Sequence, residues 1–270
     1  MSVASLEDRG EAELGRLYIL MGEIFRGGLA GTLAGVLFLG AGSRVVMRIS
    51  ALLNPEARGV ITENENIVGD ITLGGTLGLV IFIGIFGGLV VGTVWVVVRG
   101  WLPDDLPRRL PLAALLTAAT GSFAVVAADN HDFRTLNPPG LHVAMFVAIV
   151  GLAGAATAGL DRLLEGRVPT AKGVVAVFGG MAGIGLVFAA PFLAALFFLG
   201  AAGGAPPWPA GLALIAATVA TVAGWARYYS EGDAGLATRP VWQWRLGVGS
   251  VALFGLLGAA HLAREINAIV

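Results

Sequence analysis

The sequence predicts an all-α membrane protein, a polytopic bundle of about seven transmembrane helices. Charged residues make up only 13% of the chain, about half the share found in an ordinary globular domain. Glycine contributes 41 of the 270 residues, roughly twice its usual frequency. The few charges gather at the ends of long apolar runs, as expected for spanning helices, because lipid offers backbone amides no hydrogen-bond partner outside the helix.

Residues 1–22 carry charges of both signs and are expected to form an amphipathic helix on the cytoplasmic face. A cleavable signal peptide would begin with a basic segment and continue into an uninterrupted apolar run. Here the apolar run that follows contains Glu23 and Arg26. The chain therefore divides into a cytoplasmic N-terminal segment, 1–22, and a transmembrane helical domain, 23–270.

Seven apolar windows have about the length needed to cross a hydrocarbon core of ~30 Å. The third and sixth windows are rich in alanine, so six or eight crossings stay open as alternatives. Pro191 predicts a kink in the fifth window, because proline removes a helical hydrogen bond. The windows are 27–43, 73–98, 110–127, 141–160, 173–200, 210–226 and 246–262.

Basic residues set the expected orientation, because loops on the cytoplasmic side retain more arginine and lysine than exported loops. With seven crossings, five of the 17 basic residues fall on the side opposite the N-terminus. Most tryptophan and tyrosine residues lie at the membrane boundary on the same side as the N-terminus, and Trp208 lies at the opposite boundary. We expect the N-terminus inside and the C-terminus outside, in the cytoplasmic membrane of a bacterium. The five basic residues are Arg44, Arg48, Arg58, Arg134 and Arg264.

Glycine recurs every four residues in two of the windows, at 27, 31 and 35 and again at 84, 88 and 92. Gly151, Ala155 and Gly159 form a similar row in the fourth window. Such rows flatten one side of a helix, so that two backbones approach closely and weak Cα–H···O bonds form between them. The rows predict a tightly packed single bundle. A dimer seam or a sliding surface for alternating access is the alternative.

Polar residues at the outer ends of the windows exceed what anchoring requires. Arg44 and Arg48 share one helix face if the first helix continues past Ser43, and we expect them to meet carboxylates near the membrane. The alternative is structural: snorkelling arginines and loop salt bridges that fix the helix ends. The candidate substrate-binding residues are Arg44, Arg48, Glu63, Glu65, Asp129, His131, Asp132 and Arg134.

Other chemistries have weaker support in the sequence, and we expect no cofactor and no metal. His131 with Asp129 or Asp132 supplies candidate metal ligands, but no HExxH or comparable spacing is present. A haem between His142 and His261 would need both inside the bilayer, whereas each lies near the end of a window. Three serines, at positions 43, 122 and 250, lack the glycine-framed context of a nucleophile, so catalysis is not favoured.

Composition also restricts the partners. A net charge of −1 gives no basic surface for nucleic acid, and the absence of cysteine excludes disulfides and thiolate metal sites. The lipid bilayer is the expected environment, and a second copy of the chain or a subunit of a membrane complex is the candidate protein partner.

The favoured function is a small-solute transport or binding protein. Arg44 and Arg48 would take a carboxylate or phosphate group from the outer side or the outer leaflet. A non-catalytic accessory or scaffold subunit, docking through the glycine rows, is the alternative. A membrane-embedded enzyme that acts on lipid is third.

Overall fold

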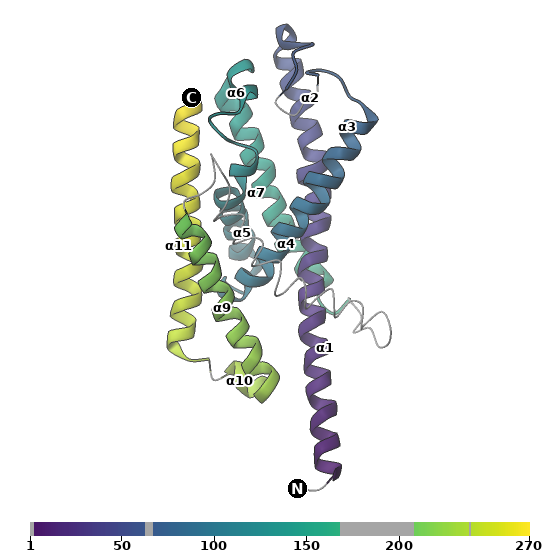
Figure 1. The fold of residues 1–270 in the computed structure, drawn as a ribbon, viewed down its shortest axis with the longest axis vertical. Coiled ribbons are helices and arrows are strands. Elements are labelled where there is room, and N and C mark those ends of the chain that lie inside the picture. Colours follow the sequence, from purple (N-terminus) through teal and green to yellow (C-terminus); the bar gives the residue numbers. More distant parts are fainter. Residues whose placement is uncertain (1–2, 63–66, 168–207, 238) are drawn as a thin grey trace.

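The computed structural model describes residues 3–62, 67–167, 208–237 and 239–270. These residues are largely helical and form no β-strand; a single antiparallel bridge joins Ile61 and Ile67 (Figure 1). The predicted all-α class is thus confirmed. Five stretches within this part of the chain are long and apolar enough to cross a membrane, so the protein is a multi-pass membrane protein. They are Leu14–Leu53, Leu73–Trp101, Pro139–Leu164, Trp208–Glu231 and Val241–Ile269.

The first stretch is one continuous helix built from α1 (Val3–Ala34), the π-helical η1 (Gly35–Gly42) and α2 (Ser43–Leu53). It therefore continues past Ser43, as the prediction for the two arginines required. It ends at Asn54, whose backbone N–H donates to Ser50. The 3-10 turn η2 (Pro55–Ala57) follows, since proline cannot donate the next helical hydrogen bond. The helix runs unbroken through residue 22, and the division of the chain there stays a prediction.

The second stretch has the same construction and returns along the first. It comprises α3 (Leu73–Gly78), the π-helical η3 (Leu79–Phe86) and α4 (Gly87–Val98), and the 3-10 turn η4 (Arg99–Trp101) closes it. Thr72 caps its start by accepting a hydrogen bond from the backbone of Gly75 at 3.1 Å. The two π-helical segments pack against each other.

The third predicted window forms a shorter helix than the others. Helix α5 (Leu106–Gly121) has 16 residues and continues into the 3-10 turn η5 (Ser122–Ala124). Asp105 caps α5 by accepting a hydrogen bond from the backbone of Arg108 at 3.1 Å. With 16 residues, α5 is not one of the five candidate spans.

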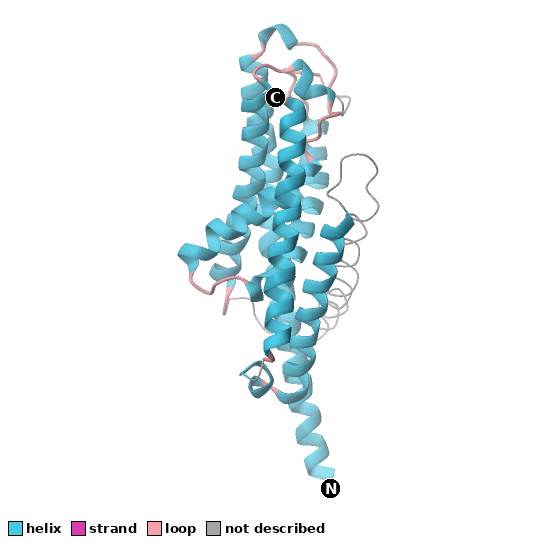
Figure 2. Cartoon of the chain, turned by 90° about the vertical axis from the view of Figure 1, so that its left-hand side faces the viewer, coloured by secondary structure: helices cyan, strands magenta, loops and turns pink. Residues whose placement is uncertain are grey.

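The remaining described helices are α6 (His131–Thr135), α7 (Pro139–Leu164), α9 (Trp208–Glu231), α10 (Asp233–Ala237) and α11 (Val241–Ile269). The fifth window, 173–200 with Pro191, lies outside the described residues, so the count of seven stays a prediction. The two termini lie at opposite ends of the long axis (Figure 1). Figure 2 shows that most described helices follow this axis and that the start of α1 projects beyond them.

The two glycine rows face each other across the contact between the first and second stretches. A Cβ atom on Gly31 would lie 2.3 Å from the Cα of Gly92, and one on Gly35 would lie 2.3 Å from the carbonyl oxygen of Gly84. A Cβ on Gly88 would lie 2.6 Å from the carbonyl oxygen of Gly31. These rows therefore form a seam inside one chain, in agreement with the predicted tight bundle.

The row in the fourth window makes less intimate contacts. Added Cβ atoms on Gly151 and Gly159 would meet their nearest neighbours at 3.4 and 3.7 Å, which is ordinary van der Waals contact. The close approach of α7 to α5 occurs instead at Gly154, where a Cβ would lie 2.3 Å from the Oγ1 atom of Thr117.

Candidate functional site

A buried group of charges joins α1, η4 and α7 toward the end of the bundle where α1 begins. Asp161 on α7 is only 3% exposed and accepts hydrogen bonds from three side chains. Its Oδ1 atom lies 2.8 Å from Arg26 Nε and 2.8 Å from Arg99 Nη1, and its Oδ2 atom lies 3.0 Å from Trp95 Nε1. We call these residues, together with Glu23, the Asp161 network.

Glu23 completes the network from the other side. Its Oε2 atom accepts a hydrogen bond from Arg26 Nη2 and another from Arg99 Nη2, each at 2.8 Å. Arg99 Nη2 also donates to the backbone carbonyl of Glu23 at 3.0 Å. Two carboxylates thus balance two guanidinium groups, and this pairing offsets the cost of removing the four charges from water. The network fastens three separate stretches of chain at one end of the bundle.

Sequence reasoning missed this network. Glu23 and Arg26 served to exclude a signal peptide. Arg26 and Arg99 were among the basic residues assigned to the same side as the N-terminus, and Asp161 was assigned no role. The available signal was an aspartate at the end of an apolar window, because an ionisable residue at membrane depth needs a partner.

A second buried polar group, the His142 cluster, lies toward the opposite end, where α2 meets the start of α7. His142 is fully buried, and its Nδ1 atom lies 2.8 Å from Ser50 Oγ. Its Nε2 atom lies 3.2 Å from Asn54 Nδ2 and 3.3 Å from the carbonyl oxygen of Asn137. Asn54 Oδ1 in turn accepts a hydrogen bond from the backbone of Asn137 at 2.6 Å. Both ring nitrogens are therefore satisfied, and the cluster ties α2 to α7.

Arg44 differs from both groups because part of its charge is unpaired. Its Nε and Nη2 atoms are buried and have no hydrogen-bond partner among the described residues. The hydroxyl of Ser122, a fully buried residue, is in the same condition. Buried polar atoms almost always have partners in folded proteins, so each exception calls for an explanation.

The glycines near these two unpaired groups pack against neighbouring residues of α7. A Cβ atom on Gly42, two residues before the arginine, would lie 3.5 Å from the Cγ2 atom of Ile149. A Cβ atom on Gly121, next to the serine, would lie 3.2 Å from the Cγ1 atom of Val150. The backbone two residues before Arg44 and the backbone next to Ser122 therefore pack against consecutive residues of α7.

The other predicted site residues are more dispersed. Arg48, Asp129 and His131 are exposed, and His131 Nε2 lies 3.2 Å from Thr135 Oγ1. The backbone N–H of Asp132 donates a hydrogen bond of 2.8 Å to the Oδ1 atom of Asn130. The remaining candidates lie outside what is described: Glu63, Glu65 and the side chain of Arg134.

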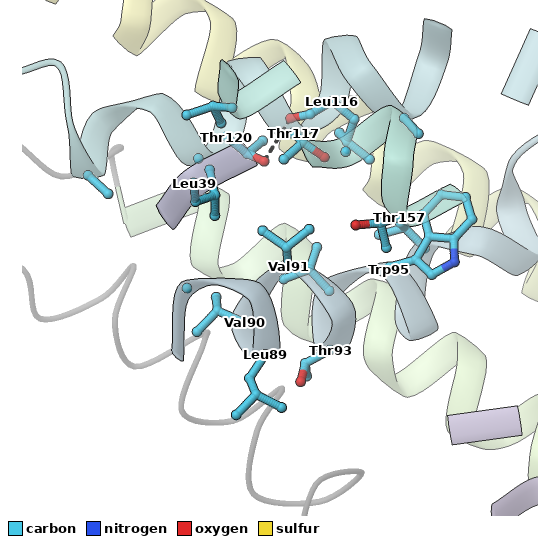
Figure 3. A pocket seen from close by; sticks show the side chains of 18 of the residues that line it. Leu39, Leu89, Val90, Val91, Thr93, Trp95, Leu116, Thr117, Thr120 and Thr157 are labelled. Carbon is cyan, nitrogen blue, oxygen red and sulfur yellow. Dashed lines mark hydrogen bonds between the residues drawn. The ribbon is translucent and has the colours of Figure 1, made fainter. Parts of the chain in front are cut away.

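An apolar cavity of about 590 Å³ lies between the first two stretches, α5 and α7, and reaches α11. Its threonines expose little polarity: Thr120 Oγ1 donates to the carbonyl of Leu116 at 2.8 Å, and Thr157 Oγ1 donates to that of Ala153 at 2.7 Å. The indole N–H of Trp95 is likewise used by the Asp161 network. The walls therefore offer mainly carbon. Figure 3 shows Leu39, Val91, Trp95, Leu116, Thr120 and Thr157 around this space.

No known protein family, curated protein or solved structure matches this chain. Its geometry is therefore the basis for assigning a function. Among the described residues, no three histidine or acidic side chains converge in the manner of a metal site. What the chain does offer is an unpaired guanidinium edge, an apolar cavity at neighbouring depth, and two satisfied polar groups that fasten helices.

Proposed function

We propose that this protein binds a small anionic solute from the outer side of the membrane, with Arg44 as its principal ligand. The observation that carries the proposal is the pair of buried, unpaired atoms on Arg44. Nε and Nη2 form one edge of the planar guanidinium, which matches the two oxygens of a carboxylate or phosphate. Burying a cation without a counter-charge costs several kcal/mol, and a bound anion would remove that cost.

The proposal includes the membrane topology that defines the outer side: seven crossings with the N-terminus inside. The directions of two described helices agree with this topology. The last turns of α7 lie beside α1, because Asp161 contacts Arg26, and the end of α9 does too, because Arg16 Nη1 donates to the carbonyl of Tyr229 at 2.7 Å. Both helices thus end on the same side, as the proposed seven crossings require. The excess of basic residues at this side supports a cytoplasmic location.

Transport, as distinct from binding, is the further step of the proposal. The Asp161 network fastens α1, η4 and α7 at the inner side, so a solute bound at Arg44 reaches the cytoplasm only when that network opens. The scaffold alternative loses its main support, because the glycine rows expected to dock a partner face each other within the chain.

Binding of two simple anions tests the proposal. Inorganic phosphate and acetate would be titrated onto the protein in phosphatidylcholine nanodiscs, with Arg44→Gln, Arg44→Lys and Arg264→Gln as variants. Arg264 is exposed near the end of α11. Arg264→Gln is the control, because it also removes one positive charge. Hydrogen bonds to charged groups are worth about 1.5–3 kcal/mol, so we expect Arg44→Gln to weaken binding roughly 10- to 100-fold.

Two results would overturn the proposal. One is the absence of measurable binding of either anion to the wild-type protein, and the other is equal affinity in wild type and Arg44→Gln. Arg44→Lys should retain part of the affinity, since it keeps the charge and loses the flat edge. Uptake of the bound anion into proteoliposomes then separates a transporter from a binding protein.

A further inference from the structure

We infer that the ligand is an amphipathic anion whose acidic group pairs with Arg44 and whose hydrocarbon chain occupies the apolar cavity. This inference rests on the proposed function and narrows its substrate class. It joins two observations made on separate residues: an unpaired guanidinium edge and an apolar cavity of about 590 Å³.

The cavity and Arg44 are close along the membrane normal. Leu39 lines the cavity and lies five residues before Arg44 on the same continuous helix, a rise of about 7 Å. Val150, which also lines the cavity, follows Ile149, whose Cγ2 atom would lie 3.5 Å from a Cβ on Gly42, two residues before Arg44. Arg44 is not among the residues that line the cavity, so an acidic group at the guanidinium would lie beyond the Leu39 end of the cavity. The first few methylenes of an attached chain would bridge this distance.

The walls select for hydrocarbon over a polar solute. The hydroxyls of Thr120 and Thr157 donate to their own helices, and the indole nitrogen of Trp95 donates to Asp161. A polar molecule would find few free partners there, whereas a hydrocarbon chain gains free energy by contact with the carbon atoms of the walls. Figure 3 shows Leu39 and Trp95 on opposite sides of the space, so a chain entering from the rim extends toward the Trp95 ring.

A photoreactive ligand tests where the chain lies. Dodecyl phosphate with a terminal diazirine would be bound to the protein in phosphatidylcholine nanodiscs, irradiated, and mapped by peptide mass spectrometry. We expect labelling at cavity residues such as Val91 and Leu116, with a loss of at least tenfold in Arg44→Gln. Labelling confined to outward-facing residues such as Leu115 and Leu253, which are 67% and 48% exposed, would overturn the inference.

A pair of neighbouring substitutions gives the matched control. Leu116→Phe places extra volume in the cavity wall, whereas Leu115→Phe adds the same group to an exposed position on the same helix. Each buried methylene contributes about fourfold in affinity. A chain that loses the burial of three methylenes therefore binds roughly 60-fold more weakly. We expect Leu116→Phe to weaken dodecyl phosphate by about this factor and to leave methyl phosphate unchanged, and Leu115→Phe to affect neither.

The two ligands separate the failure of this inference from that of the proposed function. If methyl phosphate binds through Arg44 but Leu116→Phe and Leu115→Phe affect dodecyl phosphate equally, the cavity is not the site of the chain and only the inference falls. If neither phosphate binds in an Arg44-dependent way, the proposed function itself is wrong. Phosphatidic acid included in the nanodisc then identifies the source of the ligand. If it competes with dodecyl phosphate, the natural ligand is a membrane lipid; if it does not compete, the natural ligand is a free single-chain anion.

Discussion

The indole nitrogen of Trp95 donates a hydrogen bond of 3.0 Å to the Oδ2 atom of Asp161, and the Trp95 ring also forms part of the cavity wall. A single side chain therefore contacts both the space where we place the ligand chain and the charge network that fastens the inner side. Any displacement of the ring by a ligand would act directly on a hydrogen bond of Asp161. The two features are thus mechanically connected through one residue.

Loss of the Asp161 charge should be strongly destabilising. Asp161→Asn leaves Arg26 and Arg99 with Glu23 as their common counter-charge, and breaking a buried ion pair by removing one partner costs about 3–5 kcal/mol. Unfolding in mixed sodium dodecyl sulfate and dodecyl maltoside micelles measures the change. Asp104→Asn, which removes a fully exposed partner of Arg109, serves as the control and should have little effect. The double variant Asp161→Asn/Arg99→Gln restores charge balance and should be more stable than the sum of the single effects predicts.

The glycine seam predicts opposite outcomes for two nearby alanine substitutions. A Cβ on Gly31 would lie 2.3 Å from the backbone of Gly92, whereas one on Gly28 would meet nothing within 4 Å. We expect Gly31→Ala to cost about 1–3 kcal/mol or more through overpacking. Gly28→Ala should be neutral or stabilising by up to about 1 kcal/mol through helix propensity. Equal stability of the two variants in the same unfolding assay would contradict the seam.

Removal of the His142 side chain should loosen the contact between α2 and α7. His142→Ala takes a partner from the Ser50 hydroxyl and the Asn54 amide, and a buried polar group left unpaired costs about 1–3 kcal/mol. His131→Ala, at an exposed position on the same side, is the comparison and should change stability little. Backbone hydrogen exchange near residues 50–54 should rise in the first variant and not in the second.

The proposed topology predicts which sites are reachable from outside the cell. The chain has no cysteine, so single cysteines report their own positions. A membrane-impermeant maleimide should label Glu56→Cys and Gly204→Cys in whole cells, and label Thr170→Cys and Ser230→Cys only after permeabilisation. Labelling of positions 170 and 204 from the same side would exclude a single crossing between them, and labelling of position 230 from outside would reverse the orientation.

The sequence by itself determined the all-α membrane class of the protein and the approximate positions of the described spanning helices. Hydrocarbon offers no partner to a backbone amide, so each spanning helix must satisfy its own hydrogen bonds, and this local requirement is readable as an apolar run. The helical period likewise places glycines four residues apart on one face, which is why the rows that include Gly31 and Gly88 could be predicted to lie at a close contact. The first window ended at Ser43, and the structure supplies the continuation of that helix to Leu53.

Only the tertiary structure decided which polar groups meet and which stay unpaired. Asp161 and Arg26 are 135 residues apart, and their contact depends on the rotation and depth of helices that are far apart in the sequence. The same holds for Arg44: the sequence placed it among potential partners, whereas the packing buries two of its nitrogens without a partner among the described residues. The cavity has no local pattern either, because it is the space that several helices leave between them. Pairing, orphaned charge and enclosed volume are relations between distant segments, and helical periodicity carries no information about them.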